Sequence, residues 1–151
     1  MMKVYHTTRA AFQTAPISLS KWKTVIAAHE NALADLRGFE FEFLNPAQRA
    51  FAAVRAKWPG ESQLKEGSLA QIQMHKALAA LEPVRKRHED LIDAVNRAVD
   101  EMLETPAPSM AAMALKLRTV VQSDCKGHHS ADDVLRILQG DAQRLSGGEG
   151  L

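Results

Sequence analysis

The densest group of potential metal ligands lies near the carboxyl end of the chain. It comprises Asp124, Cys125, His128 and His129, a carboxylate, a thiol and two imidazoles that lie close together in the sequence. A thiolate and two imidazoles suit zinc, so Cys125, His128 and His129 form a candidate zinc site. Structural zinc sites normally draw paired ligands from two separated places, whereas this chain offers one group. We therefore favour a polar loop with a lone cysteine, and the zinc site is the alternative.

Motifs that would identify an enzyme are absent from the rest of the sequence. There is no glycine-rich phosphate loop, no Gly-x-Ser-x-Gly elbow and no His-Glu-x-x-His pair. The carboxylates are spread along predicted helix surfaces, and spacing alone assigns no acid–base pair. The sequence therefore favours a protein that is not an enzyme and that holds no cofactor, with zinc at the Cys125–His129 loop as the alternative.

The charge balance bears on the class of partner. The chain has 19 Lys and Arg residues against 18 Asp and Glu residues, a net charge of +1. So small a net charge gives no global field that would draw the protein to nucleic acid or to an anionic membrane. The basic residues of the first half are also interleaved with Glu30, Asp35, Glu40 and Glu42. We do not expect nucleic-acid binding, and a nucleic-acid-associated accessory factor is the second alternative.

Cysteine usage and hydropathy bear on the compartment. The single cysteine, Cys125, rules out an internal disulfide and fits a reducing cytosol. No run of about 18 apolar residues predicts a membrane span. No apolar segment follows Lys3 and Arg9 as a secretory signal would require. We therefore expect a cytoplasmic protein without a membrane partner.

Residues 68–104 are expected to organise the fold. The pattern there predicts one long helix with a continuous apolar seam. At about 1.5 Å per residue it would run roughly 55 Å, whereas a compact domain of this size is about 40 Å across. Pro83 predicts a kink in a continuous helix, with two separate helices as the alternative. Apolar or small residues recur at heptad spacing in two rows, Met74, Leu81, His88, Val95 and Met102 in one and Ala77, Val84, Leu91 and Ala98 in the other.

Two helices are predicted before this segment. The first begins at Ser18 or Ser20, either of which can cap it, and carries an apolar stripe. The second begins at Asn45, because the following proline suits the first helical position. Residues 39–43 alternate as a strand would, but a strand has no good partner here, so we favour a helix that continues past Gly38. On such a helix Phe41 points away from the stripe and, if exposed, is a candidate contact point.

Two helices are predicted after it. The two prolines in residues 105–109 forbid helix continuation, and Ser109 can cap the helix that follows. This connection is short enough for the new helix to fold back against the long one. Ser130 can cap the last helix, and Asp132 and Asp133 suit the positive end of its dipole.

The run ETPAPSMAAMALKLR at residues 104–118 resembles a segment of small uncharacterised bacterial helical proteins. Those proteins carry a long helix, a Thr-Pro-Ala turn and an Ala-rich helix with Lys-Leu-Arg. The resemblance extends weakly over residues 90–145, and Pro108 departs from the pattern, in which small hydroxyl residues follow the turn. The resemblance implies a helical fold and implies no activity.

Together these observations predict an all-α protein, an elongated bundle of about five helices around the long one. We expect a flexible arm at residues 1–17, one helical domain at 18–145 and a disordered tail at 146–151. A long seam without a catalytic site is typical of a non-enzymatic scaffold that binds another protein. We expect self-association as a two-fold dimer, with Leu91, Val95 and Met102 near the contact.

Overall fold

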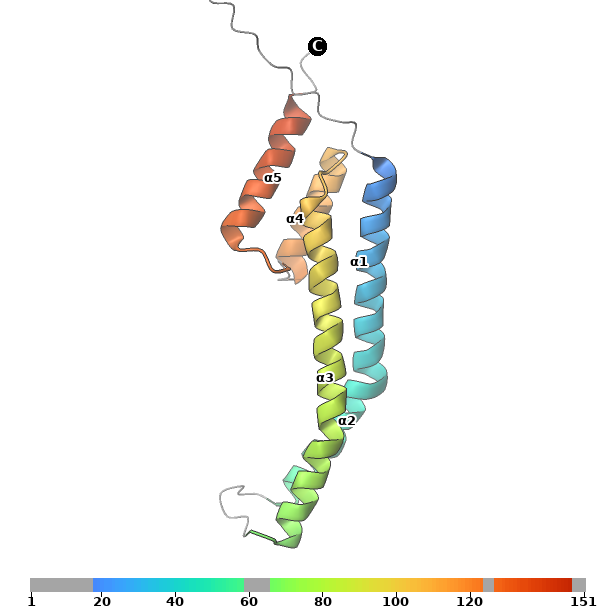
Figure 1. The fold of residues 1–151 in the computed structure, drawn as a ribbon, viewed down its shortest axis with the longest axis vertical. Coiled ribbons are helices and arrows are strands. Elements are labelled where there is room, and N and C mark those ends of the chain that lie inside the picture. The colour runs from blue at the N-terminus through green and yellow to red at the C-terminus, as the bar shows by residue number, and fades with distance from the viewer. Residues whose placement is uncertain (1–17, 59–65, 124–126, 148–151) are drawn as a thin grey trace, which may run out of the picture.

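The computed structural model describes residues 18–58, 66–123 and 127–147. Within these ranges all regular secondary structure is helical, as the composition predicted (Figure 1). The predicted arm at residues 1–17 and most of the predicted tail lie outside the described residues. Ser146, which we assigned to the tail, is the last residue of the final helix.

The first two predicted helices form one continuous rod. Helix α1 (Leu19–Phe39) passes into a π-helical segment, η1 (Glu40–Leu44), and then into α2 (Asn45–Ala56). Residues 39–43 are therefore helical, as we favoured, and the strand alternative is wrong. Because α1, η1 and α2 are joined, the described residues contain four continuous helical runs instead of the five helices expected.

Helix α2 begins at Asn45, as predicted, but the predicted capping role of Asn45 is wrong. Asn45 has helical backbone angles, and its N–H donates to the carbonyl of Glu40, five residues back. Pro46 follows directly, and it lacks the N–H that a regular helix would use there. The wider π-helical turn before Pro46 keeps the rod continuous where the sequence signal resembles a helix start.

Helix α3 (Leu69–Glu104) is the predicted long helix, with 36 residues. It begins where the sequence indicated, since the Ser68 side chain accepts a hydrogen bond of 3.2 Å from the N–H of Gln71. The helix runs through Pro83 without interruption, so the alternative of two separate helices is wrong. A kink at Pro83 stays a prediction.

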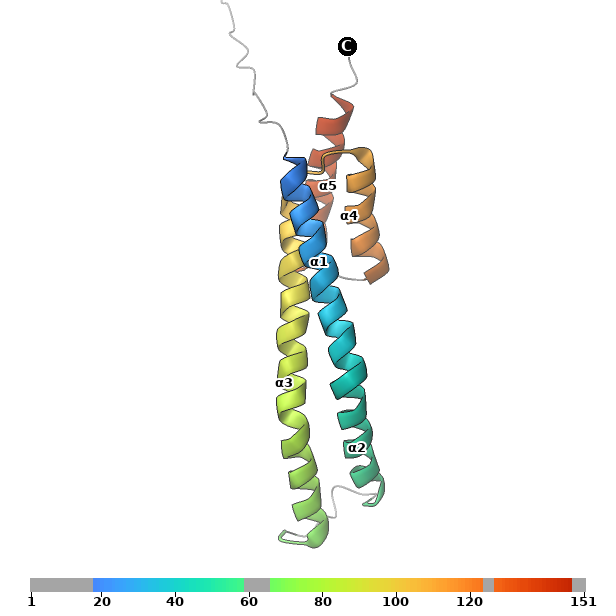
Figure 2. The same ribbon diagram turned by 90° about the vertical axis from the view of Figure 1, so that its right-hand side faces the viewer.

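The last two helices are α4 (Met110–Ser123) and α5 (Ala131–Ser146). Ser109 accepts from the N–H of Ala112, and Ser130 forms a reciprocal capping box with Asp133, which confirms both predicted caps. Helix α4 turns back antiparallel to α3, also as predicted, and lies beside α5 (Figure 2).

The molecule has two unlike halves. In the first, the head, α4 and α5 pack against the first part of α1 and the last part of α3 (Figures 1 and 2). In the second, the stalk, defined as η1, α2 and residues 66–88, only two antiparallel helical runs lie side by side. The head holds both clusters of buried apolar residues, one of Trp22, Val25, Met102, Ala107 and Ala112 and the other of Val95, Val99, Leu103 and Val134.

Candidate interaction surface

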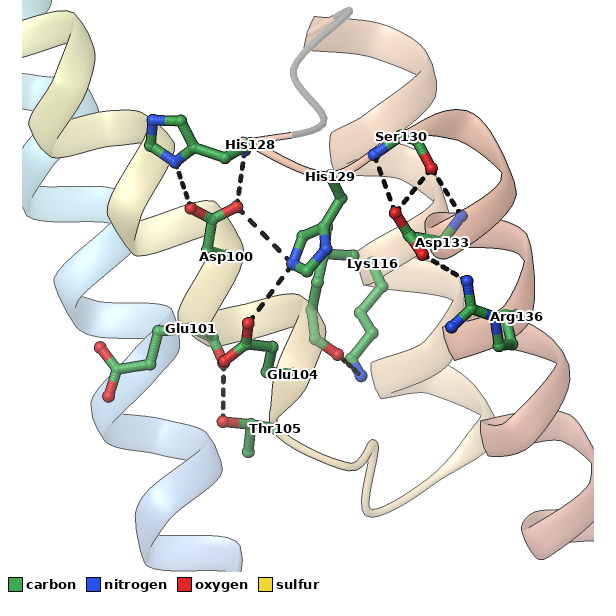
Figure 3. A network of polar contacts seen from close by, with 11 residues as sticks. Asp100, Glu101, Glu104, Thr105, Lys116, His128, His129, Ser130, Asp133 and Arg136 are labelled. Atoms are coloured by element: carbon green, nitrogen blue, oxygen red, sulfur yellow. Dashed lines mark hydrogen bonds and ion pairs between the residues drawn. The ribbon is translucent and has the colours of Figure 1, made fainter.

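The histidines of the predicted zinc site contact helix α3. The main-chain N–H of His128 donates to Asp100 Oδ1 at 2.7 Å, and His128 Nδ1 lies 2.5 Å from Asp100 Oδ2 (Figure 3). His129 Nε2 is buried and lies 3.7 Å from Asp100 Oδ1 and 3.6 Å from Glu104 Oε1. No local pattern in the sequence pointed to Asp100, which precedes His128 by 28 residues. Cys125 lies outside the described residues.

The loop before α5 fits closely against Asp100. Gly127 has a φ of +61°, and a Cβ at this position would lie 2.0 Å from Asp100 Oδ1. Only glycine accepts both the backbone angle and the close approach. Asp100 therefore fixes the loop on α3, which is a structural role. In the part of the chain that the structure describes, no group of three or more His, Cys, Asp or Glu residues could hold a metal ion, and the zinc site stays a prediction.

A buried ion pair joins α4 to α5. Lys116 is 0% exposed, and its ammonium donates to Asp141 Oδ2 and to the carbonyl of Leu103, both at 2.7 Å. Asp141 Oδ1 accepts from the N–H of Ala107 and from Arg144, both at 3.0 Å, and Arg144 also donates to the Ala107 carbonyl. These bonds hold the turn between α3 and α4 against α5. The polar contacts of Lys116 and Asp141 all join elements of the fold, so we assign this network a structural role.

The two members of this pair have different environments. Burial lowers the pKa of the Lys116 ammonium by more than the hydrogen bond and the charge of Asp141 raise it. Burial raises the pKa of the Asp141 carboxyl, but hydrogen bonds from Lys116, the Ala107 N–H and Arg144 outweigh burial and lower it overall. The Asp141 carboxylate therefore accepts hydrogen bonds from Lys116, the Ala107 N–H and Arg144. The Lys116 ammonium donates only to that carboxylate and to the Leu103 carbonyl among the described residues.

The three residues that we expected near a dimer contact are buried within the chain. Leu91 and Val95 are buried, and Met102 is 0% exposed and packs with Trp22 of α1. These side chains cannot reach a second copy while the head is folded. A dimer contact near them stays a prediction. The apolar residues that α3 exposes are different ones, among them Leu69 at 64% and Ile72 at 57% exposure.

The stalk leaves apolar surface open to solvent. Helix α2 has an apolar stripe, yet none of its residues is buried. A groove of about 460 Å³ is lined by residues of α2 and α3 and by Lys57. Leu69 and Ile72 lie one helical turn before groove residues Gln73 and Lys76, on the same side of α3. The apolar groove lining consists of Ala47, Ala50, Phe51 and Val54 from α2 and of Ala77, Ala80 and Leu81 from α3.

The π-helical segment adds exposed aromatic surface to the stalk. Phe41 is 78% exposed, and Phe43 stacks on Phe39 with ring centroids 5.3 Å apart. The projection of Phe41 away from the stripe is as predicted. On the inner side, His88 Nε2 lies 2.9 Å from Glu40 Oε1 and ties α3 to η1. An exposed phenylalanine beside an anchored turn can contact a partner at little conformational cost.

None of the described helices is both long enough and apolar enough to cross a bilayer. Comparison of the chain with protein-family models, with curated proteins and with solved structures finds no match. The resemblance to small bacterial helical proteins stays a prediction.

Proposed function

We propose that this protein is a non-enzymatic helical interaction protein. Its head holds the fold together, and its stalk presents an apolar groove to a helix of another chain. One observation supports the proposal above all: α2 carries an apolar stripe but buries no residue. The two helical runs of the stalk bury Leu44, Ala70, Met74 and Leu81, but they leave every residue of α2 exposed or half-buried, and α4 and α5 lie only at the head.

The exposed apolar residues of the stalk form a continuous surface, which favours a binding site over apolar residues exposed by chance. Single exposed apolar residues are common on protein surfaces, but a continuous apolar groove is a recurrent feature of interaction sites. The groove is lined by both helices of the stalk and continues toward Leu69 and Ile72. We place the protein in the cytoplasm, the compartment that a lone cysteine fits. A second copy of the chain, which the long apolar seam led us to expect, is one candidate occupant of the groove.

Site-specific photo-crosslinking in the native host tests this proposal. A photoreactive residue at Gln73 or Ala80, which line the groove, should give discrete protein adducts. The matched control is Ala79, which is exposed and lies about 100° around α3 from Ala80. An adduct of twice the mass of the chain identifies a second copy, and another mass identifies a different protein. Equal adduct patterns at Ala80 and Ala79 would contradict the groove as a binding site.

A metal-binding protein is the second candidate, because Cys125, His128 and His129 lie close together in the sequence and are residue types that suit zinc. Elemental analysis of the purified protein tests it. Stoichiometric zinc that is lost in Cys125→Ala would support this candidate, and zinc that is retained in that variant would remove Cys125 from the ligands.

A further inference from the structure

We propose that the groove between α2 and α3 binds an amphipathic helix with acidic residues beside its apolar face, and that a different protein supplies this helix. The proposal rests on the proposed function and names the chemistry of the partner. Three observations support it: the shape of the groove, the way α4 covers α1 and α3 in the head, and the charge of the groove rim.

The shape of the groove suits a helix. Its lining runs from Ala47 to Lys57 on α2 and from Gln73 to Leu81 on α3. At about 1.5 Å per residue these stretches are roughly 12–15 Å long. An occupant helix that places apolar residues at i, i+3, i+4 and i+7 spans roughly 10 Å and would fill this length.

The head shows how the same chain covers a pair of helices. In the head, α1 and α3 lie side by side, as α2 and α3 do in the stalk (Figure 2). Side chains of α4 pack against both α1 and α3 there. Ala112 of α4 is buried with Trp22, Val25 and Met102, and Met113 and Leu115 of α4 pack against this cluster. In the stalk no described element takes the place of α4. A third helix from another chain would continue the packing of the head.

The charge of the stalk specifies the flanks of that helix. Lys57 and Lys76 line the groove, and neither takes part in an ion pair among the described residues. Lys57 and Lys76 are the charged residues of the groove lining, and no Asp or Glu lines the groove. A partner helix with Glu or Asp beside its apolar face therefore meets complementary charge on both sides of the groove.

The same charge disfavours a second copy in this groove. In a two-fold contact the same surface faces itself, so Lys57 and Lys76 of one chain would approach the lysines of the other. Like charges at a contact select against that partner. The nearly neutral net charge of the chain hides this local positive charge, because no acidic residue lines the groove.

Selection from a peptide display library tests the proposal. The library holds helical peptides of about 14 residues with a fixed apolar face and with flanking positions randomised among Glu, Gln and Lys. On the wild-type protein we expect Glu to exceed Lys at the flanks by about tenfold. Lys57→Glu/Lys76→Glu should reverse this preference. Lys21→Glu/Lys23→Glu, an equal charge change on α1, should leave it unchanged. Circular dichroism verifies that each variant is folded.

A second pair of variants separates the groove from the charge. Ala80→Gln places a neutral, longer side chain in the groove and should abolish recovery of the selected peptides, whereas Ala79→Gln should not. Loss with Ala80→Gln but no flank preference would overturn the acidic partner and leave the proposed function standing. Peptides that bind Ala80→Gln as well as they bind the wild type would overturn both. Recovery of no peptide would overturn the proposal of an acidic helix. The proposal would also be overturned if the protein bound anionic vesicles but no peptide, and if Ala80→Gln removed that vesicle binding.

Discussion

Asp141→Ala removes the carboxylate that faces the fully buried ammonium of Lys116. The ammonium then keeps one acceptor, the carbonyl of Leu103 at 2.7 Å, and the Trp22 ring, whose centroid lies 5.8 Å from Nζ. Breaking a buried ion pair by removing one partner costs about 3–5 kcal/mol. A domain of this kind is stable by about 5–15 kcal/mol, so the variant should lose a large share of its stability.

Urea unfolding followed by far-UV circular dichroism measures this loss. We expect the midpoint to fall while the m-value stays the same, because the surface exposed on unfolding hardly changes. In a thermal scan the same loss lowers Tm by about 6–20 °C, at about 2–4 °C per kcal/mol for a chain of this length.

The order of the variants is the sharper test. Lys116→Met leaves Asp141 with the N–H of Ala107 and the guanidinium of Arg144, so it should cost only about 1–2 kcal/mol. The double variant Lys116→Met/Asp141→Ala buries no unpaired charge and should be more stable than Asp141→Ala alone. The reasoning is refuted if Asp141→Ala costs less than about 1 kcal/mol, or if adding Lys116→Met to it destabilises the protein further.

Three further predictions concern the head. Gly127→Ala should lose about 1–3 kcal/mol of stability, because φ is +61° and the new Cβ would clash with Asp100. Gly140→Ala, in a helix where the new Cβ meets nothing within 4 Å, should gain about 0.5–1 kcal/mol. Chemical denaturation measures both variants, and equal effects would contradict the close fit of Gly127 against Asp100. Ser130→Ala should cost about 1 kcal/mol through loss of the capping box, measured in the same way, and an unchanged midpoint would argue against the cap. The lowered pKa of Asp141 stabilises the fold above the ordinary carboxyl value of 3.8, and this contribution is lost as the pH falls through the lower folded-state pKa. The stability difference between wild type and Asp141→Asn should therefore shrink below about pH 3.8, and a difference that stays constant from pH 7 to pH 2 would count against it.

Local sequence signals determined the helices themselves. The heptad rows of residues 68–104 predicted α3, and Ser68, Ser109 and Ser130 marked the starts of α3, α4 and α5. Such signals can be read from a sequence because a helical period and a cap involve residues only three or four positions apart. Asn45 misled for the same reason: its local pattern is that of a helix start, whereas η1 carries the rod past it.

The polar contacts were decided by the tertiary structure. Lys116 meets Asp141 across 25 residues, and Asp100 meets His128 across 28. No spacing rule predicts such pairs, because they depend on how the turns between α3, α4 and α5 bring the helices together. Lys116 lies four residues after the buried Ala112, on the core-facing side of α4, and this placement was the only local sign of its role.

Which part of the apolar seam stays uncovered was also decided by the tertiary structure. Periodicity predicts that a face is apolar but does not say what covers it. The chain covers Leu91, Val95 and Met102 with its own helices, so the predicted contact residues lie in the core. Helices α4 and α5 have 14 and 16 residues, whereas α3 has 36, and they reach only its last part. The stalk groove is therefore open because of the unequal lengths and the placement of the helices, which no single segment of the sequence contains.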